Sequence, residues 1–83
     1  MYALTYDRRI EKDLRPLPRP QRELILSKLE RLTIEPRHAQ VEKLEGIEGY
    51  RLRVGDYRAL FTIDDRNRLV TIRRIRHRRD AYR

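Results

Sequence analysis

The chain has 83 residues, carries a formal net charge of +8 at pH 7 and contains no cysteine. This length allows one domain, residues 1–83, with a thin core, because so small a domain buries only about 60–65% of its unfolded surface. The absence of thiols excludes a disulfide framework and a thiolate zinc site. No stretch approaches the roughly 20 apolar residues of a membrane span, and "MYALTYDRRI" lacks a signal peptide's apolar run, so we expect a cytoplasmic protein.

The N-terminal segment predicts a strand followed by a short helix. "YALTY", residues 2–6, is typical of a short strand, and Asp7 can cap the helix that follows it. Ile10, Leu14 and Leu17 then recur at helical spacing.

A second helix is predicted after the break "PLPRP" at residues 16–20, with Pro20 suited to its first turn. This helix covers residues 21–35 and ends before Pro36. Its apolar stripe consists of Ile25, Leu29 and Leu32.

The C-terminal half predicts an antiparallel meander. A short strand near residues 41–44 precedes three further strands, at residues 50–54, 57–63 and 69–75. Gly55-Asp56 has the Gly-X pattern of a type II′ hairpin turn, and "DDRNR" is a polar loop. The predicted fold class is therefore α+β: a βαα unit followed by an antiparallel meander, with the helical hairpin packed on one face of a small twisted sheet.

The positive charge is concentrated in the predicted meander. Residues 1–49 have a net charge of +1 and residues 50–83 a net charge of +7. Of the 21 basic residues 18 are arginine, whose planar fork binds phosphate bidentately, although genome composition can also favour arginine. We expect a localised positive surface.

Strand alternation places Arg51, Arg53 and Arg58 on one face of the meander, with Arg53 directly opposite Arg58. Like charges at such positions destabilise a sheet, and we expect no acidic neighbour on that face. A solvated sheet face is the plain alternative. A partner anion, either a phosphate or an acidic protein, accounts better for the uniform sign. The opposite, core face carries Tyr50, Leu52, Val54, Tyr57, Ala59, Phe61 and Ile63.

The tail "RHRRDAYR" adds His77, Arg78, Arg79 and Tyr82 beside this face. Each residue alone is more often structural, but together they indicate a site, since histidine exchanges protons near neutral pH and tyrosine stacks on bases. Other polar residues lack such company or the spacing of a carboxylate pair or metal site: His38, Asp64, Asp65 and Asp80.

"KLEG" at residues 43–46, "YRLRVGDYRALF" at 50–61 and "HRRDAYR" at 77–83 resemble the RelE/ParE superfamily of bacterial and archaeal toxins, and more closely its RelE-like branch. The order of predicted elements is also similar to that family, so the resemblance covers essentially the whole chain.

The resemblance implies a toxin of a type II toxin–antitoxin system that inhibits translation. RelE-type members are ribosome-dependent endoribonucleases that cut mRNA by attack of the ribose 2′-OH on phosphorus, without a metal or other cofactor. The implied partners are the ribosome, mRNA and a cognate acidic antitoxin, with operator DNA reached only through the antitoxin and no membrane. ParE-type members share the fold but inhibit DNA gyrase.

The resemblance also implies residue roles. Basic hairpin residues fall on Arg51 and Arg53, the phosphate-binding arginine on Arg58, and a C-terminal arginine for proton donation or charge stabilisation on Arg78. The tyrosine that packs against substrate falls on Tyr82.

The chain departs from the family at several of these positions. Nucleolytic members carry lysine where this chain has Arg51 and Arg53, and arginine is a poor general base. Arg76 replaces a frequent glycine, and we group it with Arg79 as substrate-binding. His77 is left as a candidate acid or base.

Three functions remain open on these residues. The joint presence of the His-Arg-Arg run and Tyr82 favours an mRNA endoribonuclease. The alternatives are a ParE-like gyrase inhibitor and a basic nucleic-acid-binding module that does not cleave.

Overall fold

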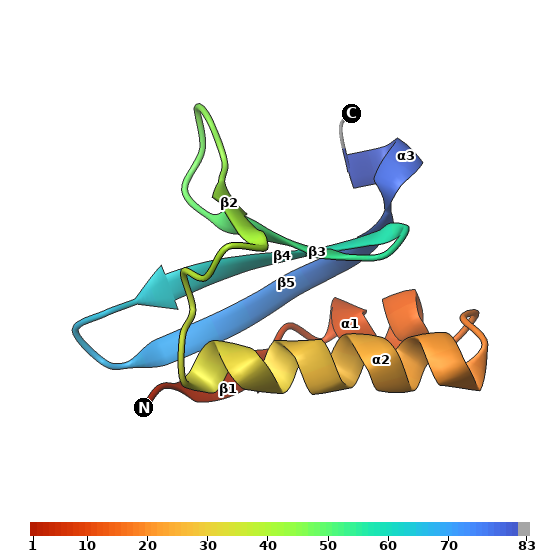
Figure 1. Cartoon of the computed structure of the whole chain (residues 1–83), viewed down its shortest axis with the longest axis horizontal. Helices are drawn as coiled ribbons and strands as arrows, with labels where there is room; N and C mark the ends of the chain where they lie inside the picture. The colour runs from red at the N-terminus through yellow and green to blue at the C-terminus, as the bar shows by residue number, and fades with distance from the viewer. Residues whose placement is uncertain (82–83) are drawn as a thin grey trace.

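The structure, a computed structural model that describes residues 1–81, is a five-stranded sheet with two helices packed on one face (Figure 1). The strand order is β1-β5-β4-β3-β2, and all neighbours are antiparallel except β1 and β5, which are parallel. This arrangement confirms the predicted α+β class. The elements are β1 Ala3–Tyr6, α1 Arg9–Leu14, α2 Arg19–Glu30, η1 Arg31–Thr33, β2 Val41–Lys43, β3 Tyr50–Val54, β4 Tyr57–Asp64, β5 Leu69–His77 and α3 Arg78–Ala81.

The helix α2 supplies the apolar stripe that covers the sheet. Ile25 and Leu29 of α2 and Leu32 of the following turn η1 are fully buried, as predicted. They share one core with residues of β3, β4 and β5, including Leu52 and Phe61. The α-helix ends at Glu30, earlier than predicted, because the chain tightens into the 3₁₀ turn η1 well before Pro36.

The β3–β4 hairpin has the predicted register and turn. Arg53 pairs directly with Arg58, and Val54 pairs with Tyr57. Gly55 has a φ of +56°, whereas Arg68 is the one non-glycine residue with positive φ among residues 1–81. Asp56 therefore keeps a negative φ, as a type II′ turn requires.

A carboxylate on α1 closes the part of the β5 edge that β1 leaves unpaired. The parallel pairing with β1 extends only from Leu69 to Ile72. Beyond it, Asp13 accepts a hydrogen bond from the Ile75 backbone N–H at 2.9 Å and from Arg74 Nε at 2.9 Å and Nη2 at 3.0 Å. Desolvation raises the pKa of Asp13, but these hydrogen bonds outweigh it and leave the pKa below its ordinary value.

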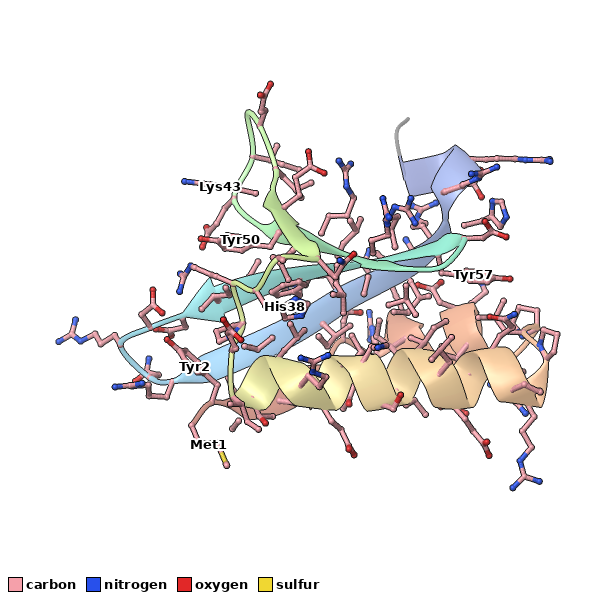
Figure 2. All side chains as sticks on the ribbon, viewed as in Figure 1. Met1, Tyr2, His38, Lys43, Tyr50 and Tyr57 are labelled. Atoms are coloured by element: carbon pink, nitrogen blue, oxygen red, sulfur yellow. The ribbon has the colours of Figure 1, made fainter. Side chains whose placement is uncertain are left out.

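A second carboxylate, Asp65 in the β4–β5 turn, joins four segments at the other end of the sheet. Arg37 donates to both of its oxygens at 3.0 and 2.8 Å, and the Tyr2 hydroxyl donates at 2.6 Å. Arg37 Nε also donates to the Tyr50 hydroxyl at 3.1 Å. Figure 2 shows Tyr2 and Tyr50 toward this end of the sheet and Tyr57 at the opposite end.

The C-terminal strand is longer than predicted. β5 runs to His77 rather than to Ile75, and Arg78 begins the one-turn helix α3. A register shift beside Leu60 and Phe61 places Arg74 and Ile72 opposite these two residues. No helix among residues 1–81 is long and apolar enough to span a membrane.

Acid should weaken the fold through Asp65. Hydrogen bonds from Arg37 and then Tyr2 lower the pKa of Asp65 to about 2, below the ordinary carboxyl value of 3.8. Because the folded-state pKa is the lower one, the stabilisation is complete above the unfolded pKa and is lost as pH falls toward 2. We expect Asp65→Asn to flatten the fall in the free energy of unfolding between about pH 4 and 2, measured by urea denaturation. Asp80→Asn, which removes a carboxylate outside this network, is the control, and an equal flattening in both variants would contradict the assignment.

Candidate functional site

A row of three arginines crosses the sheet on the face that the helices leave uncovered. Arg53 in β3 pairs with Arg58 in β4, which pairs with Arg76 in β5, so the three side chains point to the same face. We call these residues the arginine row. The β2 segment with its following loop and the helix α3 rise on either side of this face (Figure 1).

Arg58 is the buried member of the row. The residue is only 8% exposed, and its Nη1 donates to the Gly55 and Tyr57 carbonyls, both at 2.8 Å. The described residues provide no acceptor for Nε and Nη2, yet they contain no buried polar atom without a partner, so these groups face solvent. A buried guanidinium fixed by neutral carbonyls retains its charge for an incoming anion. Nε and Nη2 form the fork that binds two oxygens of a phosphate.

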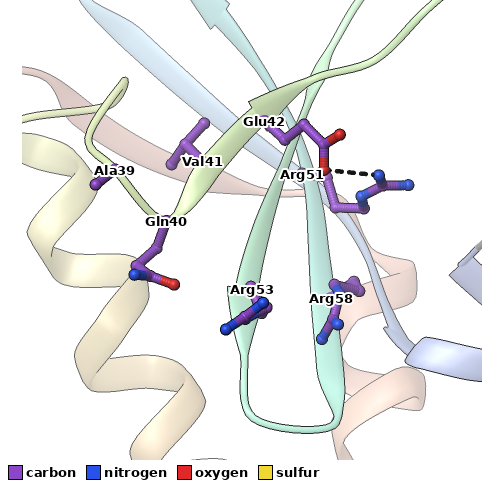
Figure 3. Close-up of a pocket in the computed structure, with 7 residues that line it drawn as sticks. All are labelled: Ala39, Gln40, Val41, Glu42, Arg51, Arg53 and Arg58. Carbon is purple, nitrogen blue, oxygen red and sulfur yellow. Dashed lines mark hydrogen bonds and ion pairs between the residues drawn. The ribbon is translucent and has the colours of Figure 1, made fainter.

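A pocket of about 300 Å³ lies in front of Arg58. Figure 3 shows Arg53 and Arg58 at one end of this pocket and the pair Glu42–Arg51 at the other. The lining residues are Ala39, Gln40, Val41, Glu42, Arg51, Arg53 and Arg58.

Glu42 corrects the expectation that this face carries no acidic neighbour. It lies in β2 directly opposite Arg51, and Arg51 Nη2 donates to Glu42 Oε2 at 2.9 Å. The Arg51 side chain is only 14% exposed, whereas that of Glu42 is 69% exposed. Arg51 is therefore part of an ion pair, and the signal for it in the sequence was the short strand at residues 41–44.

The arginine row differs from the other arginines of the sheet in its charge environment. Within residues 1–81, Arg53, Arg58 and Arg76 form no ion pair within 4.0 Å, although Arg76 contributes to lowering the pKa of Asp13. Arg37 and Arg74, in contrast, are held by Asp65 and Asp13. Three arginines without an ion pair within the described residues thus lie side by side on the open face, near the β3–β4 turn.

The helix α3 begins beside the hairpin turn. The Arg78 backbone N–H donates to the Asp56 carbonyl at 2.7 Å, and Arg78 Nε lies 3.9 Å from Asp56 Oδ1. This contact places Arg78 near the turn whose Gly55 carbonyl accepts a hydrogen bond from Arg58. Arg79 is exposed on α3, and Tyr82 lies outside the described residues.

His77 does not join the arginine row. It pairs with Tyr57 across β4 and β5, and its ring meets the Tyr57 ring edge-on with centroids 5.5 Å apart. Tyr57 packs against the core, and neighbouring residues of a strand point to opposite faces. The structure therefore does not bring His77 beside Arg58, because the extension of β5 places it opposite Tyr57, and its catalytic role stays a prediction. Its Nδ1 accepts the Arg79 backbone N–H at 3.3 Å.

The acidic residues of the described chain do not form a metal site. Within residues 1–81 no group of three or more His, Cys, Asp and Glu side chains could hold a metal ion. What the site offers is cationic hydrogen-bond donors and one carboxylate, which suits an anionic ligand such as a phosphodiester.

A small, basic α+β domain thus has helices on one face of its sheet and the arginine row on the other. The sequence model of the family described as the ParE toxin of the type II toxin–antitoxin system parDE matches residues 4–82. The chain belongs to this family and is a toxin of the RelE/ParE superfamily.

Solved structures of RelE toxins have the same fold. The archaeal RelE–RelB complex from Pyrococcus horikoshii superposes with a TM-score of 0.82 at 28% identity, covering 93% of this chain and 94% of that chain. The intact RelBE complex of E. coli gives 0.79 at 27% identity, with 93% and 96% covered. The RelBE2 complex of Mycobacterium tuberculosis gives 0.70 at 30% identity, with 92% and 96% covered. Among curated proteins no sequence matches.

Removing one charge from the arginine row should not destabilise the protein. Arg53 lies opposite Arg58 and is exposed, so Arg53→Thr relieves like-charge repulsion while keeping a residue suited to a strand. We expect the free energy of unfolding to stay unchanged or rise by up to about 1 kcal/mol, measured by thermal denaturation at low salt. A clear loss of stability would show that Arg53 has a structural role.

Proposed function

We propose that this toxin cleaves messenger RNA on the ribosome, with the arginine row binding the scissile phosphate. The observation that carries the proposal is Arg58, a buried guanidinium held by two carbonyls with its remaining donors facing a pocket. Such a group is positioned before substrate arrives, so it stabilises developing charge without reorganisation. The likeness to RelE structures supports the same function.

The reaction that suits these residues is transesterification within the RNA. The ribose 2′-oxygen forms a bond to phosphorus, the bond to the 5′-oxygen breaks, and a 2′,3′-cyclic phosphate and a 5′-hydroxyl result. The five-coordinate phosphorus carries more negative charge than the starting diester. Arg58 would bind two of its oxygens, while Arg53 and Arg76 flank it from adjacent strands.

Arg78 would act at the edge of this site. Its backbone is tied to Asp56 in the hairpin turn, and its exposed guanidinium lies beside the carboxylate of the same residue. An arginine remains protonated, so it stabilises the departing 5′-oxygen by charge. Arg79 would contact the RNA backbone outside the pocket.

Binding to DNA gyrase is the second candidate, because the matching family model is that of ParE toxins. In that case the arginine row would bind an acidic surface and perform no chemistry. Induction of the toxin separates the two: ribosomal cleavage stops translation first, whereas gyrase inhibition first produces DNA damage.

A cognate antitoxin is the proposed protein partner. The P. horikoshii and E. coli RelE structures are complexes with RelB antitoxins. For this chain we propose an acidic antitoxin segment whose carboxylates neutralise the arginine row and so block the pocket.

Arg58→Ala should abolish most of the cleavage. Loss of one preorganised donor costs roughly 10²–10³ in rate, by analogy with oxyanion holes. The assay is single-turnover cleavage of ribosome-bound mRNA in a purified translation system, with analysis of the product ends. Arg66→Ala, which removes an exposed arginine from the distant β4–β5 turn, is the matched control and should retain full activity.

Two results would overturn this function. A 5′-phosphate product would exclude attack by the 2′-hydroxyl. Full activity of Arg58→Ala, with Arg66→Ala equally active, would remove the arginine row from catalysis.

The antitoxin should bind at a rate that depends on salt. Opposite charges steer association, so we expect the association rate constant to fall as ionic strength rises. Arg53→Thr should reduce both the rate and its salt dependence, as measured by stopped-flow fluorescence. An association rate that salt and this variant leave unchanged would contradict charge-steered binding to the arginine row.

A further inference from the structure

We propose that Glu42 accepts the proton from the attacking hydroxyl and that Arg51 positions it. The inference rests on the proposed function, since it names the residue that activates the nucleophile. It also accounts for the ion pair between Glu42 and Arg51, which phosphate binding by Arg51 would leave unexplained.

Among the side chains that line the pocket, one is a candidate for accepting the proton. Ala39 and Val41 have no ionisable group, and the amide of Gln40 is not basic. The three arginines that line the pocket have donors only and stay protonated. His77 lies on the opposite face. Within residues 1–81, Glu42 is thus the one pocket side chain that can accept a proton.

The geometry suits this role. Oε2 of Glu42 accepts the Arg51 hydrogen bond at 2.9 Å, which holds the carboxylate beside Arg51 at one end of the pocket (Figure 3). The side chain is still 69% exposed, so a bound hydroxyl can reach the carboxylate. Arg53 follows Arg51 by two residues on β3, and the Glu42 end therefore lies about 7 Å along the strand from the arginine row. A ribose between the two ends would place its 2′-hydroxyl toward Glu42 and its phosphate on Arg58.

The proton balance of the step is simple. The carboxylate takes the proton of the 2′-hydroxyl as the oxygen bonds to phosphorus, and the P–O5′ bond breaks. The 5′-oxygen takes a proton from water, and Glu42 later releases its proton to solvent. No metal, oxidant or further reactant takes part.

Arg51 acts through Glu42 rather than on the phosphate. Its guanidinium is largely buried and bonded to the carboxylate, whereas Arg53 is exposed beside Arg58. Arg51 is accordingly a positioning residue. Replacing it should lower the rate of cleavage more than the affinity for RNA.

Glu42→Gln is the decisive variant. It keeps the shape of the side chain and a hydrogen bond to Arg51 but cannot take a proton. We expect the single-turnover rate on ribosome-bound mRNA to fall roughly 10²–10⁴-fold, with binding of a 2′-deoxy substrate analogue unchanged. Glu45→Gln, in the neighbouring loop, is the matched control and should cleave as the wild type does.

The pH profile and a modified substrate separate a base from a structural residue. In the wild type the rate should fall at acid pH as the base becomes protonated, and Glu42→Gln should lose this dependence. An mRNA with a 5′-bridging sulfur at the scissile bond has a leaving group that needs no proton. Glu42→Gln should stay slow on it, because its defect lies in activation of the nucleophile.

Arg51→Ala should lower the maximal rate of cleavage while the substrate concentration at half-saturation stays unchanged. Arg51→Lys should recover part of the rate. Unchanged cleavage by Glu42→Gln, or recovery on the sulfur substrate, would overturn the inference while wild-type cleavage upholds the proposed function. Equal losses of binding and rate would also overturn it. Failure of the wild type to cleave would overturn both.

Discussion

The sheet is covered by helices on one face only, and the rest of the molecule depends on this asymmetry. Alternation along β3, β4 and β5 sends one set of side chains into the core and the other into solvent. With α1, α2 and η1 covering one face only, the core is a single layer that includes Ile10, Ile25, Leu32 and Phe61. The open face contributes little to stability, and it can therefore carry mutually repelling charges.

Two carboxylates hold the helical layer and the connections to the sheet. Asp13 fixes α1 to the free edge of β5, and Asp65 ties the N-terminus and the connection before β2 to the β4–β5 turn. Both carboxylates are bound by arginines, which hold their pKa values low. These ion pairs thus lie at the β5 edge and at the β4–β5 turn, while the arginine row near the β3–β4 turn lacks them within the described residues. An anion that binds at the arginine row therefore contacts guanidinium groups that form no ion pair within the described residues.

The hairpin could be predicted because its signals are local. The alternation around Gly55 fixes both the turn type and the opposition of Arg53 and Arg58. The partner of Arg51 could not be derived in the same way, since β2 has only three residues and its pairing depends on the whole connection from α2. The face that His77 joins could not be predicted for a related reason. Two further residues of β5 pairing decide which face it joins, and that pairing depends on contacts remote in sequence.

The pocket combines Arg58, which forms no ion pair within the described residues, with Arg51, which is paired with Glu42. This difference explains why arginine can occupy every basic position of the pocket. A lysine could serve both as a charge and, with a lowered pKa, as a base, whereas arginine serves only as a charge. Under the proposed function, a pocket built from arginine needs its proton acceptor elsewhere, and the β2–β3 pairing places the Glu42 carboxylate there. The same carboxylate would repel an acidic antitoxin that approached its end of the pocket. Neutralisation by such a partner is thus favoured at the Arg58 end, where substrate phosphate would also bind, so that the two ligands would exclude each other.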